Sequence, residues 1–293
     1  MEQEYISPGH LACQGCGAAI GMRHTLRVLG RNTIVVIPAC CWSVIGGPFP
    51  YSALTVPVIH TAFETAGATS AGVRAALDMQ GKEDVTVLAW AGDGGTFDIG
   101  LQALSGAVER NDNILYICYD NEAYMNTGIQ RSSATPYGAW TTTTPERHPK
   151  EEPKKDIIQI MAAHKIPYAA TASVAYLADF AEKLRKAQRI KGSKFIHLLC
   201  PCPPGWKMSS EKTIKVARLA TLAKVFPLYE VLNGDTYIIS VEPHKDLPIS
   251  EYFKYQRRFA HLSPQQMVEI QKRVDFEWER LVHKAMLEGL TTG

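Results

Sequence analysis

Short apolar runs alternate with amphipathic stretches along the first two thirds of the chain. Nearly all-apolar runs rich in β-branched residues predict four strands buried on both faces, at residues 33–37, 85–89, 114–119 and 195–199. The stretches between them predict helices over residues 61–79, 97–109 and 174–190. Strands that alternate with helices form βαβ units, so we expect an α/β fold with a mostly parallel sheet and helices on both faces.

Beyond Trp206 the pattern changes to a hairpin followed by one long helix. Two apolar runs flank Asn233-Gly234-Asp235, a turn sequence typical of β-hairpins. Ser263 then supplies an N-cap, Pro264 the first helical position and Gln266 the third. An apolar stripe at helical spacing follows: Met267, Ile270, Val274, Leu281 and Ala285. We therefore expect a main domain over residues 1–206 and a C-terminal hairpin and helix extension over residues 207–293 that wraps the domain or a neighbouring subunit.

Composition limits the class of protein. The 293 residues are 46% hydrophobic and 20% charged, enough for one large α/β domain or two small ones. The formal net charge of +2, without a basic block, does not suggest nucleic acid as a partner. No apolar stretch reaches the length of a membrane span. Seven cysteines, in a chain whose acidic start lacks an apolar signal core, indicate reduced thiols and a cytoplasmic location.

A turn at Gly92-Asp93-Gly94 carries the first candidate chemistry. It directly follows a predicted strand, and 26 residues separate Gly94 from Asn121, which lies just past the next strand. Ligands of open α/β sheets bind at the carboxyl ends of the strands. There Asp93 offers a carboxylate, Asn121 an amide oxygen and Ala123 its backbone carbonyl, and Mg²⁺ prefers such hard oxygen ligands.

This spacing is the signature of a thiamine diphosphate site. The glycines let the backbone approach the diphosphate, and a helix from about Thr96 would aim its N–H groups at the phosphates. Gly92-Asp93-Gly94 alone could be an ordinary strand-to-helix turn, but Asn121 at this spacing favours the cofactor site. The loop over residues 127–153 is long and rich in Thr, Ser, Pro and Gly, and such loops are usually functional or disordered.

A second candidate site begins with Cys13 and Cys16, a Cys-x-x-Cys pair in a glycine-rich turn. Such a pair alone can be half of a zinc site or a redox dithiol. A zinc site would normally take its other half from a second close pair of Cys or His. A [4Fe–4S] cluster instead binds four thiolates, which can come from separate loops.

The remaining thiolates would come from two further cysteine pairs. Cys40 and Cys41 are adjacent, and Cys200 and Cys202 are one residue apart, so neither pair has the spacing of a zinc half-site. A cluster that collects one thiolate from each loop is therefore the better interpretation. Cys41 is preferred to Cys40 and Cys202 to Cys200, with both alternatives open. Cys118 lies within an apolar run and is expected to be a buried core thiol.

Together these residues resemble the β subunit of the 2-oxoacid:ferredoxin oxidoreductases, most closely that of the members that act on pyruvate. The resemblance covers essentially the whole chain. The segments that carry it are Gly9-His10, Cys13-x-x-Cys16-Gly17, Pro57-Val58-Ile59-His60-Thr61-Ala62-Phe63-Glu64, Gly92-Asp93-Gly94, Tyr119-Asp120-Asn121-Glu122-Ala123-Tyr124-Met125-Asn126-Thr127-Gly128, Gln130-Arg131-Ser132-Ser133, Thr135-Pro136 and Pro201-Cys202-Pro203. Phe63-Glu64 is similar to the pyruvate and branched-chain members and differs from the 2-oxoglutarate members.

The resemblance implies a thiamine-diphosphate-binding fold and a site that lies between an α and a β subunit. It implies these site residues: Cys13, Cys16, Cys41 and Cys202 for one [4Fe–4S] cluster; Asp93, Asn121 and Ala123 for Mg²⁺; Gly92, Gly94 and Thr127 with those three for thiamine diphosphate; and Asn126 as the catalytic candidate, near the thiazolium and the substrate carboxylate. The glutamate that activates thiamine comes from the α subunit in this family, so we expect Glu64 to be structural.

The implied activity is the reversible oxidative decarboxylation of pyruvate to acetyl-CoA and CO₂ in anaerobic metabolism. Thiamine supplies the carbanion chemistry, and the cluster removes electrons one at a time. Implied partners are the α subunit, γ and δ ferredoxin-like subunits, ferredoxin and coenzyme A. The alternatives are the same chemistry on branched-chain 2-oxoacids or oxalate, a non-redox thiamine decarboxylase or synthase, and an electron-transfer subunit without thiamine.

Overall fold

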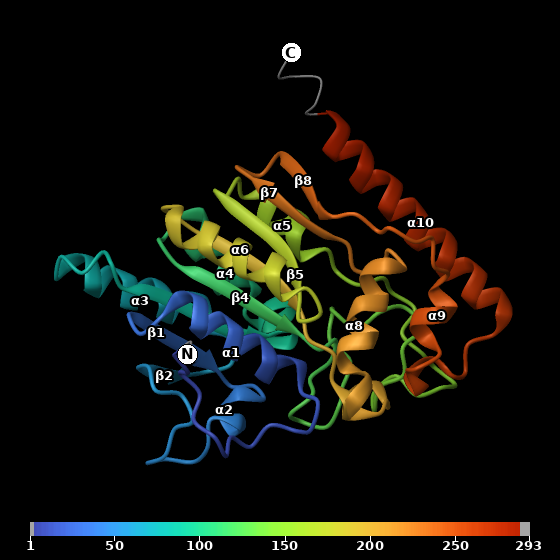
Figure 1. Cartoon of the computed structure of the whole chain (residues 1–293), viewed down its shortest axis with the longest axis horizontal. Helices are drawn as coiled ribbons and strands as arrows, with labels where there is room; N and C mark the ends of the chain where they lie inside the picture. Colours follow the sequence, from blue (N-terminus) through green and yellow to red (C-terminus); the bar gives the residue numbers. More distant parts are fainter. Residues whose placement is uncertain (1–2, 288–293) are drawn as a thin grey trace.

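The computed structural model describes residues 3–287, and one sheet of eight strands runs through this part of the chain (Figure 1). The strands are β1 (Thr33–Pro38), β2 (Val58–Thr61), β3 (Thr86–Gly92), β4 (Leu115–Asp120), β5 (Tyr168–Ser173), β6 (Lys194–Leu199), β7 (Leu228–Leu232) and β8 (Thr236–Val241). Their order is β2-β1-β3-β4-β6-β5-β7-β8; the first six are parallel, and β7 and β8 are antiparallel. The expected mostly parallel α/β fold is confirmed.

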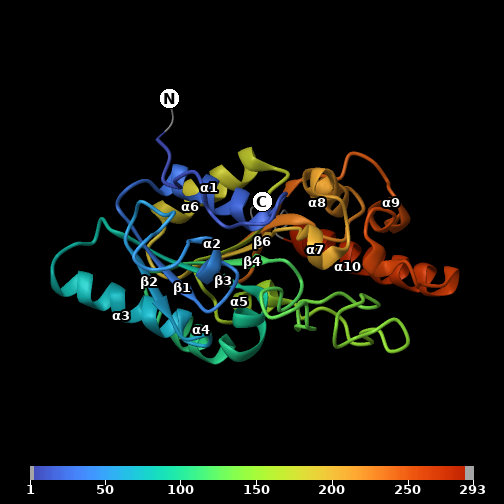
Figure 2. The same ribbon diagram turned by 90° about the horizontal axis from the view of Figure 1, so that it is seen from below.

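Helices cover both faces of the sheet. The helices are α1 (Gly17–Leu29), α2 (Trp42–Ile45), α3 (Ala66–Met79), α4 (Leu101–Glu109), α5 (Ile157–Ala163), α6 (Leu177–Arg189), α7 (Pro203–Trp206), α8 (Thr213–Leu222), α9 (Ile249–Phe253) and α10 (Pro264–Leu287), with the short segments η1 (Gly94–Ile99), η2 (Ser210–Lys212) and η3 (Arg257–Phe259). Figure 2 shows α1 and α6 on one side of the sheet and α3, α4 and α5 on the other. None of the helices described in residues 3–287 is both long and apolar enough to cross a membrane.

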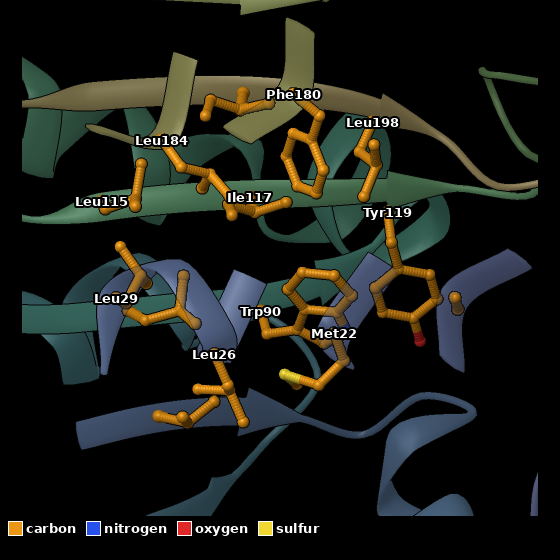
Figure 3. Close-up of a cluster of buried hydrophobic side chains, with 14 of the residues drawn as sticks. Met22, Leu26, Leu29, Trp90, Leu115, Ile117, Tyr119, Phe180, Leu184 and Leu198 are labelled. Carbon is orange, nitrogen blue, oxygen red and sulfur yellow. The ribbon is translucent and has the colours of Figure 1, made fainter. Parts of the chain in front are cut away.

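The core on the α1 face illustrates why these segments pack as they do. Met22 and Leu26 lie one turn apart on α1, and both are fully buried against Trp90 of β3 (Figure 3). Phe180 and Leu184 of α6 fill the same layer over β4 and β6. Strands covered on both faces are apolar throughout, which is why their sequences run without polar alternation.

The C-terminal segment forms the expected hairpin and helix. The hairpin β7–β8 joins the edge of the sheet at β5, and α10 packs on β8 and α9. The capping box is present, because Ser263 Oγ accepts from Gln266 N at 3.2 Å and Gln266 Oε1 accepts from Ser263 N at 2.9 Å. Along α10, Ile270 and Leu281 are buried. The division of the chain into residues 1–206 and 207–293 stays a prediction.

Three elements differ from the sequence prediction. The helix predicted from residue 61 begins at Ala66, because residues 58–61 pair with β1 as a strand, Pro38 opposite Thr61. The helix predicted over residues 97–109 is a π-helical turn, η1, followed by α4. The helical backbone therefore starts at Gly94 rather than at Thr96. β5 was not predicted, since its alanine-rich sequence has little strand propensity and becomes a strand by pairing between β6 and β7.

Candidate cofactor and metal site

Two neighbouring strands of the sheet end with the oxygen-bearing residues. Asp93 follows β3 and Asn121 follows β4, and Gly92 lies opposite Tyr119 in the parallel pairing of the two strands. The turn after β3 requires glycine at position 94, since a Cβ there would lie 2.4 Å from the ring of Tyr124. The sequence motif and the sheet register therefore bring both strand ends to one place.

The amide of Asn121 bridges the other two predicted Mg²⁺ ligands. It lies 3.0 Å from Asp93 Oδ1 and 3.0 Å from the carbonyl oxygen of Ala123. In one orientation the amide nitrogen donates to both oxygens; turned by 180°, the amide sets its own oxygen against them. Three converging oxygen atoms form a donor set that fits Mg²⁺.

Asp93 is buried, and its carboxylate is the only charged group among these three. Ser132 Oγ donates to Asp93 Oδ2 at 2.5 Å. Burial, and then the nearby charge of Asp120, hold the pKa of the Asp93 carboxyl well above its usual range. A bound divalent cation would favour the ionised carboxylate and so lower the pKa of Asp93 again.

Behind the metal ligands lies a buried network of charges that the sequence analysis did not identify. Asp120 accepts hydrogen bonds from His197 Nε2 at 2.7 Å, from the Glu122 backbone N–H at 2.8 Å, and from Lys154 Nζ. Burial would raise the pKa of Asp120, but Lys154 and His197 outweigh burial and bring it to about 2. Lys154 Nζ also donates to Glu122 Oε1 at 2.9 Å. No local signal marks these residues, because Lys154 and His197 are distant from Asp120 in sequence.

The loop after β4 continues into an exposed turn that carries the two remaining candidates. Asn126 and Thr127 are exposed, and Thr127 Oγ1 donates to Gln130 Oε1 at 2.5 Å. Tyr124 and Gln130 pair as an isolated β-bridge that closes the turn. Both candidates therefore share a loop with Asn121 and face outward within this chain.

Two of the segments that carry predicted cluster ligands are in direct contact: the Cys13–Cys16 turn and the segment before Cys202. The Cys16 N–H donates to the Cys13 carbonyl at 3.1 Å, which closes the Cys-x-x-Cys turn, and Gly17 N donates to Pro201 O at 3.2 Å. A Cβ on Gly17 would lie 2.8 Å from the Cys200 backbone. The turn therefore packs directly against the segment that leads to Cys202.

The four predicted thiols influence one another electrostatically. Burial raises the pKa of the Cys41 thiol, and the thiols of Cys202, Cys40 and Cys16 raise it further, in that order. Burial raises the pKa of Cys202 to about 12, and Cys16 and Cys13 contribute to this shift. Thiols held this close in a partly buried place favour the neutral form until a metal centre binds the thiolates. The donor set fits a [4Fe–4S] cluster.

The alternative cysteines have other surroundings. Burial raises the pKa of the Cys40 thiol, and the neighbouring Tyr119 hydroxyl partly offsets this shift. Cys200 is 1% exposed and belongs to the core beneath α1, and Cys118 is fully buried, as expected for a core thiol. Within the described residues no three His, Cys, Asp or Glu side chains converge closely enough for a single metal ion.

The two candidate sites adjoin each other. A Cβ on Gly205 would lie 2.2 Å from Met125 Sδ and 3.5 Å from Cys202 Sγ, so Met125 and Cys202 flank the same glycine. Met125 lies on the loop that carries Asn121 and Asn126. The loop of the predicted thiamine site therefore packs against a predicted cluster ligand.

A cavity of about 460 Å³ lies beside the charge network and is distinct from the predicted metal position. Its lining includes Glu122, Lys154 and His197 and many aromatic side chains, such as Tyr229 and Tyr252. Asp93, Asn121 and Ala123 are not among the residues that line it.

A family model and several characterised relatives match this chain over much of its length. Residues 41–198 match the family model of the thiamine pyrophosphate enzymes' C-terminal, thiamine-binding domain. The chain is 54% identical to the ketoisovalerate oxidoreductase subunit VorB of Pyrococcus abyssi, over 98% of this chain and 95% of that protein. It is 52% identical to the pyruvate synthase subunit PorB of Methanothermobacter thermautotrophicus, over 94% of this chain and 96% of that protein. The pyruvate synthase subunit PorB of Pyrococcus furiosus is 44% identical, over 97% of this chain and 96% of that protein.

Among solved structures, the fold is similar to a 2-oxoglutarate:ferredoxin oxidoreductase from Magnetococcus marinus. The TM-score is 0.59 at 22% identity, covering 73% of this chain and 79% of that chain, so the likeness concerns the fold. That structure contains 2-oxoglutarate, coenzyme A and succinyl-CoA.

Proposed function

Because the chain belongs to the family of 2-oxoacid:ferredoxin oxidoreductase β subunits, we propose that it carries the Mg²⁺–thiamine diphosphate site and one [4Fe–4S] cluster of an enzyme that converts pyruvate to acetyl-CoA and CO₂. The observation that carries the proposal is the convergence of the Asp93, Asn121 and Ala123 oxygens at a loop that packs, through Met125, beside Cys202. The reaction is reversible, and its electrons leave through ferredoxin-like subunits to ferredoxin.

Bound thiamine diphosphate supplies the carbanion chemistry, and a cluster at Cys13, Cys16, Cys41 and Cys202 accepts the electrons singly. Asp93, Asn121 and the Ala123 carbonyl hold Mg²⁺, and Ser132 orients the Asp93 carboxylate. The first backbone N–H groups of a helix lack helical partners, so those at the start of η1, directly after β3, would be available to bind the diphosphate.

The remaining predicted site residues divide between the cofactor and the substrate. Gly92 and Gly94 let the backbone approach the cofactor, and Thr127 holds the turn that presents Asn126. Asn126, an amide donor without a charge, orients the substrate carboxylate. Its exposure in this chain is what a site completed by an α subunit requires, and the α subunit also supplies the glutamate that activates the cofactor.

A second substrate, the branched-chain acid 2-ketoisovalerate, has specific support. Pyrococcus furiosus has both kinds of subunit, which allows a direct comparison. The chain is 53% identical to its ketoisovalerate oxidoreductase subunit and 44% identical to its pyruvate synthase subunit. Against this, the pyruvate synthase subunits of methanogens are 50–52% identical. Most side chains that would contact the substrate tail belong to the α subunit.

The test uses the native complex purified without oxygen. Visible absorbance and EPR are followed while pyruvate or 2-ketoisovalerate is added, with and without coenzyme A. Cluster reduction by pyruvate, accelerated by coenzyme A, supports the proposal. Reduction by 2-ketoisovalerate but not by pyruvate would retain the proposed reaction type and change the proposed substrate. Absence of iron and sulfide from the complex would refute the redox function and leave a thiamine decarboxylase or synthase.

A further inference from the structure

The loop that carries two of the proposed Mg²⁺ ligands contains one residue in an unfavourable backbone conformation. Glu122, between Asn121 and Ala123, has φ of 69°, in the left-handed region where residues with a Cβ are uncommon. This turn brings the Asn121 amide to 3.0 Å from Asp93 Oδ1 and to 3.0 Å from the Ala123 carbonyl oxygen. Other contacts must hold the turn in place, because the backbone alone does not favour it.

The Glu122 side chain is buried and is held at both carboxylate oxygens. Lys154 Nζ donates to Oε1 at 2.9 Å, and Arg258 Nη2 donates to Oε2 at 2.6 Å. Glu122 and Arg258 are 3% and 2% exposed, so this is an ion pair without access to water. Lys154 is shared with Asp120, whereas Arg258 ion-pairs with Glu122 alone among the described residues.

Arg258 reaches the same loop by a second route. It lies on η3, 136 residues after Glu122, and its guanidinium stacks 3.9 Å from the centre of the Trp206 ring. The indole N–H of Trp206 donates to the backbone carbonyl of Asn121 at 2.8 Å. One side chain from the C-terminal segment therefore supports Asn121 through Trp206 and Glu122 directly.

Gln256 fixes the orientation of the guanidinium. Its Oε1 accepts from Arg258 Nε at 3.1 Å and from Arg258 Nη2 at 2.8 Å. A planar, forked cation that stacks on an indole while donating in its own plane is a geometry that arginine provides and lysine does not.

We propose that Arg258 is a positioning residue for the Mg²⁺–thiamine diphosphate site: it holds the Asn121–Ala123 turn in the conformation that places the Asn121 amide between Asp93 and the Ala123 carbonyl. The inference rests on the proposed metal site and adds to it a residue from the other end of the chain. It also gives the C-terminal segment a role in cofactor binding, since loss of Arg258 would leave Glu122 buried without its main counter-charge.

The test measures cofactor binding rather than turnover. In the assembled complex, thiamine diphosphate binding is measured by equilibrium dialysis at increasing Mg²⁺, for Arg258→Met, Arg258→Lys and wild type. We expect the Mg²⁺ concentration for half-saturation to rise about 10- to 100-fold in Arg258→Met, as for other residues that orient metal ligands. Arg258→Lys should give a smaller rise, and excess Mg²⁺ should restore full binding in both variants.

Arg257→Met is the matched control, because Arg257 lies on the same short helix and is exposed. Its Mg²⁺ requirement should equal that of wild type. If Arg258→Met does not assemble, the double variant Glu122→Gln and Arg258→Met, which removes both buried charges, takes its place. If neither protein assembles, Arg258→Lys decides the question alone. An unchanged Mg²⁺ requirement in Arg258→Lys and in whichever Arg258→Met protein assembles overturns the proposal. So does a loss of binding that excess Mg²⁺ does not restore.

Failure of the proposed function would look different. In that case wild type itself would bind thiamine diphosphate without Mg²⁺ or not at all, and Asp93→Asn would leave binding unchanged. A wild type that needs Mg²⁺, with Arg258 variants that need no more of it, would retain the proposed function and reject the role of Arg258.

Discussion

The ring of Tyr124 occupies the space beside Gly94 that a side chain would need, so the turn after β3 and the loop after β4 are locked together. A Cβ at residue 94 would lie 2.4 Å from Tyr124 Cε1, and the Tyr124 hydroxyl donates to Asp98 Oδ2 at 2.8 Å. The two strand ends that carry the proposed metal ligands therefore keep a fixed separation through direct contact of side chain and backbone.

Gly94→Ala should disrupt this contact. The methyl group would displace the Tyr124 ring and break its bond to Asp98, at a cost of about 1–3 kcal/mol in the free energy of unfolding. Thiamine diphosphate content should fall with it, because the loop that carries Asn121 moves. Gly72→Ala is the control: Gly72 lies in α3 with open space around its Cβ position, so this variant should gain about 0.5–1 kcal/mol and keep the cofactor. Melting temperature and bound cofactor are measured together, and normal cofactor content in Gly94→Ala would contradict the expectation.

Asp93→Asn separates stability from cofactor binding. The substitution keeps the shape and the hydrogen bond from Ser132 but removes a carboxylate that burial disfavours. We expect the affinity for thiamine diphosphate at fixed Mg²⁺ to fall more than about 10-fold, while the melting temperature of the cofactor-free chain rises. Asp246→Asn, at an exposed carboxylate paired with Lys224, should change neither quantity. Retention of the cofactor by Asp93→Asn would show that the proposed metal site is wrong.

The two cysteine pairs offer matched tests of the cluster ligands. Cys41→Ser and Cys202→Ser should lose iron and visible absorbance, whereas Cys40→Ser and Cys200→Ala should retain both. The reason is that the Cys202 thiol acts on the pKa of Cys41, while Cys40 lies beside the Tyr119 hydroxyl and Cys200 lies in the core. Iron and sulfide are quantified per chain in anaerobically purified complexes. The reverse pattern within either pair would reassign that ligand to its neighbour.

Lys194 should make stability depend on pH. It is 6% exposed at the start of β6 and donates to Asn113 Oδ1 at 2.5 Å. Burial, and then the charge of Arg74, lower the pKa of Lys194 to about 8. Between pH 8 and roughly pH 10 the unfolded chain binds this proton more tightly than the folded one, so stability rises with pH across that window.

Lys194→Met removes the buried charge. The chain should then gain on the order of 2–3 kcal/mol at pH 7 and lose much of the rise in stability above pH 8. Lys191→Met, at an exposed position three residues earlier, should leave the pH profile unchanged. Melting temperatures from pH 6 to 10 measure both effects. A lower melting temperature at pH 7, with the wild-type rise intact, would refute this assignment.

Elements whose signals lie between neighbouring residues could be predicted from the amino-acid sequence. Strands β1, β3, β4 and β6 follow from unbroken apolar runs, the hairpin from Asn233-Gly234-Asp235, and the start of α10 from its capping box. The turn at Gly92-Asp93-Gly94 and its spacing to Asn121 could be predicted in the same way. A strand that ends in a tight turn restricts the residue types at adjacent positions. Periodicity and turn chemistry involve neighbours in the chain, so they can be read without the fold.

The surroundings of those elements depend on contacts that form only in the folded chain. The alanine-rich β5 is a strand because it pairs with β6 and β7, and residues 58–61 are a strand because they pair with β1. Arg258 lies 136 residues from Glu122, and nothing in either local sequence indicates their ion pair. The different surroundings of Cys40 and Cys41 also depend on which side chain faces Tyr119. Such contacts are set by how the layers pack, because packing brings together residues that the chain itself keeps far apart.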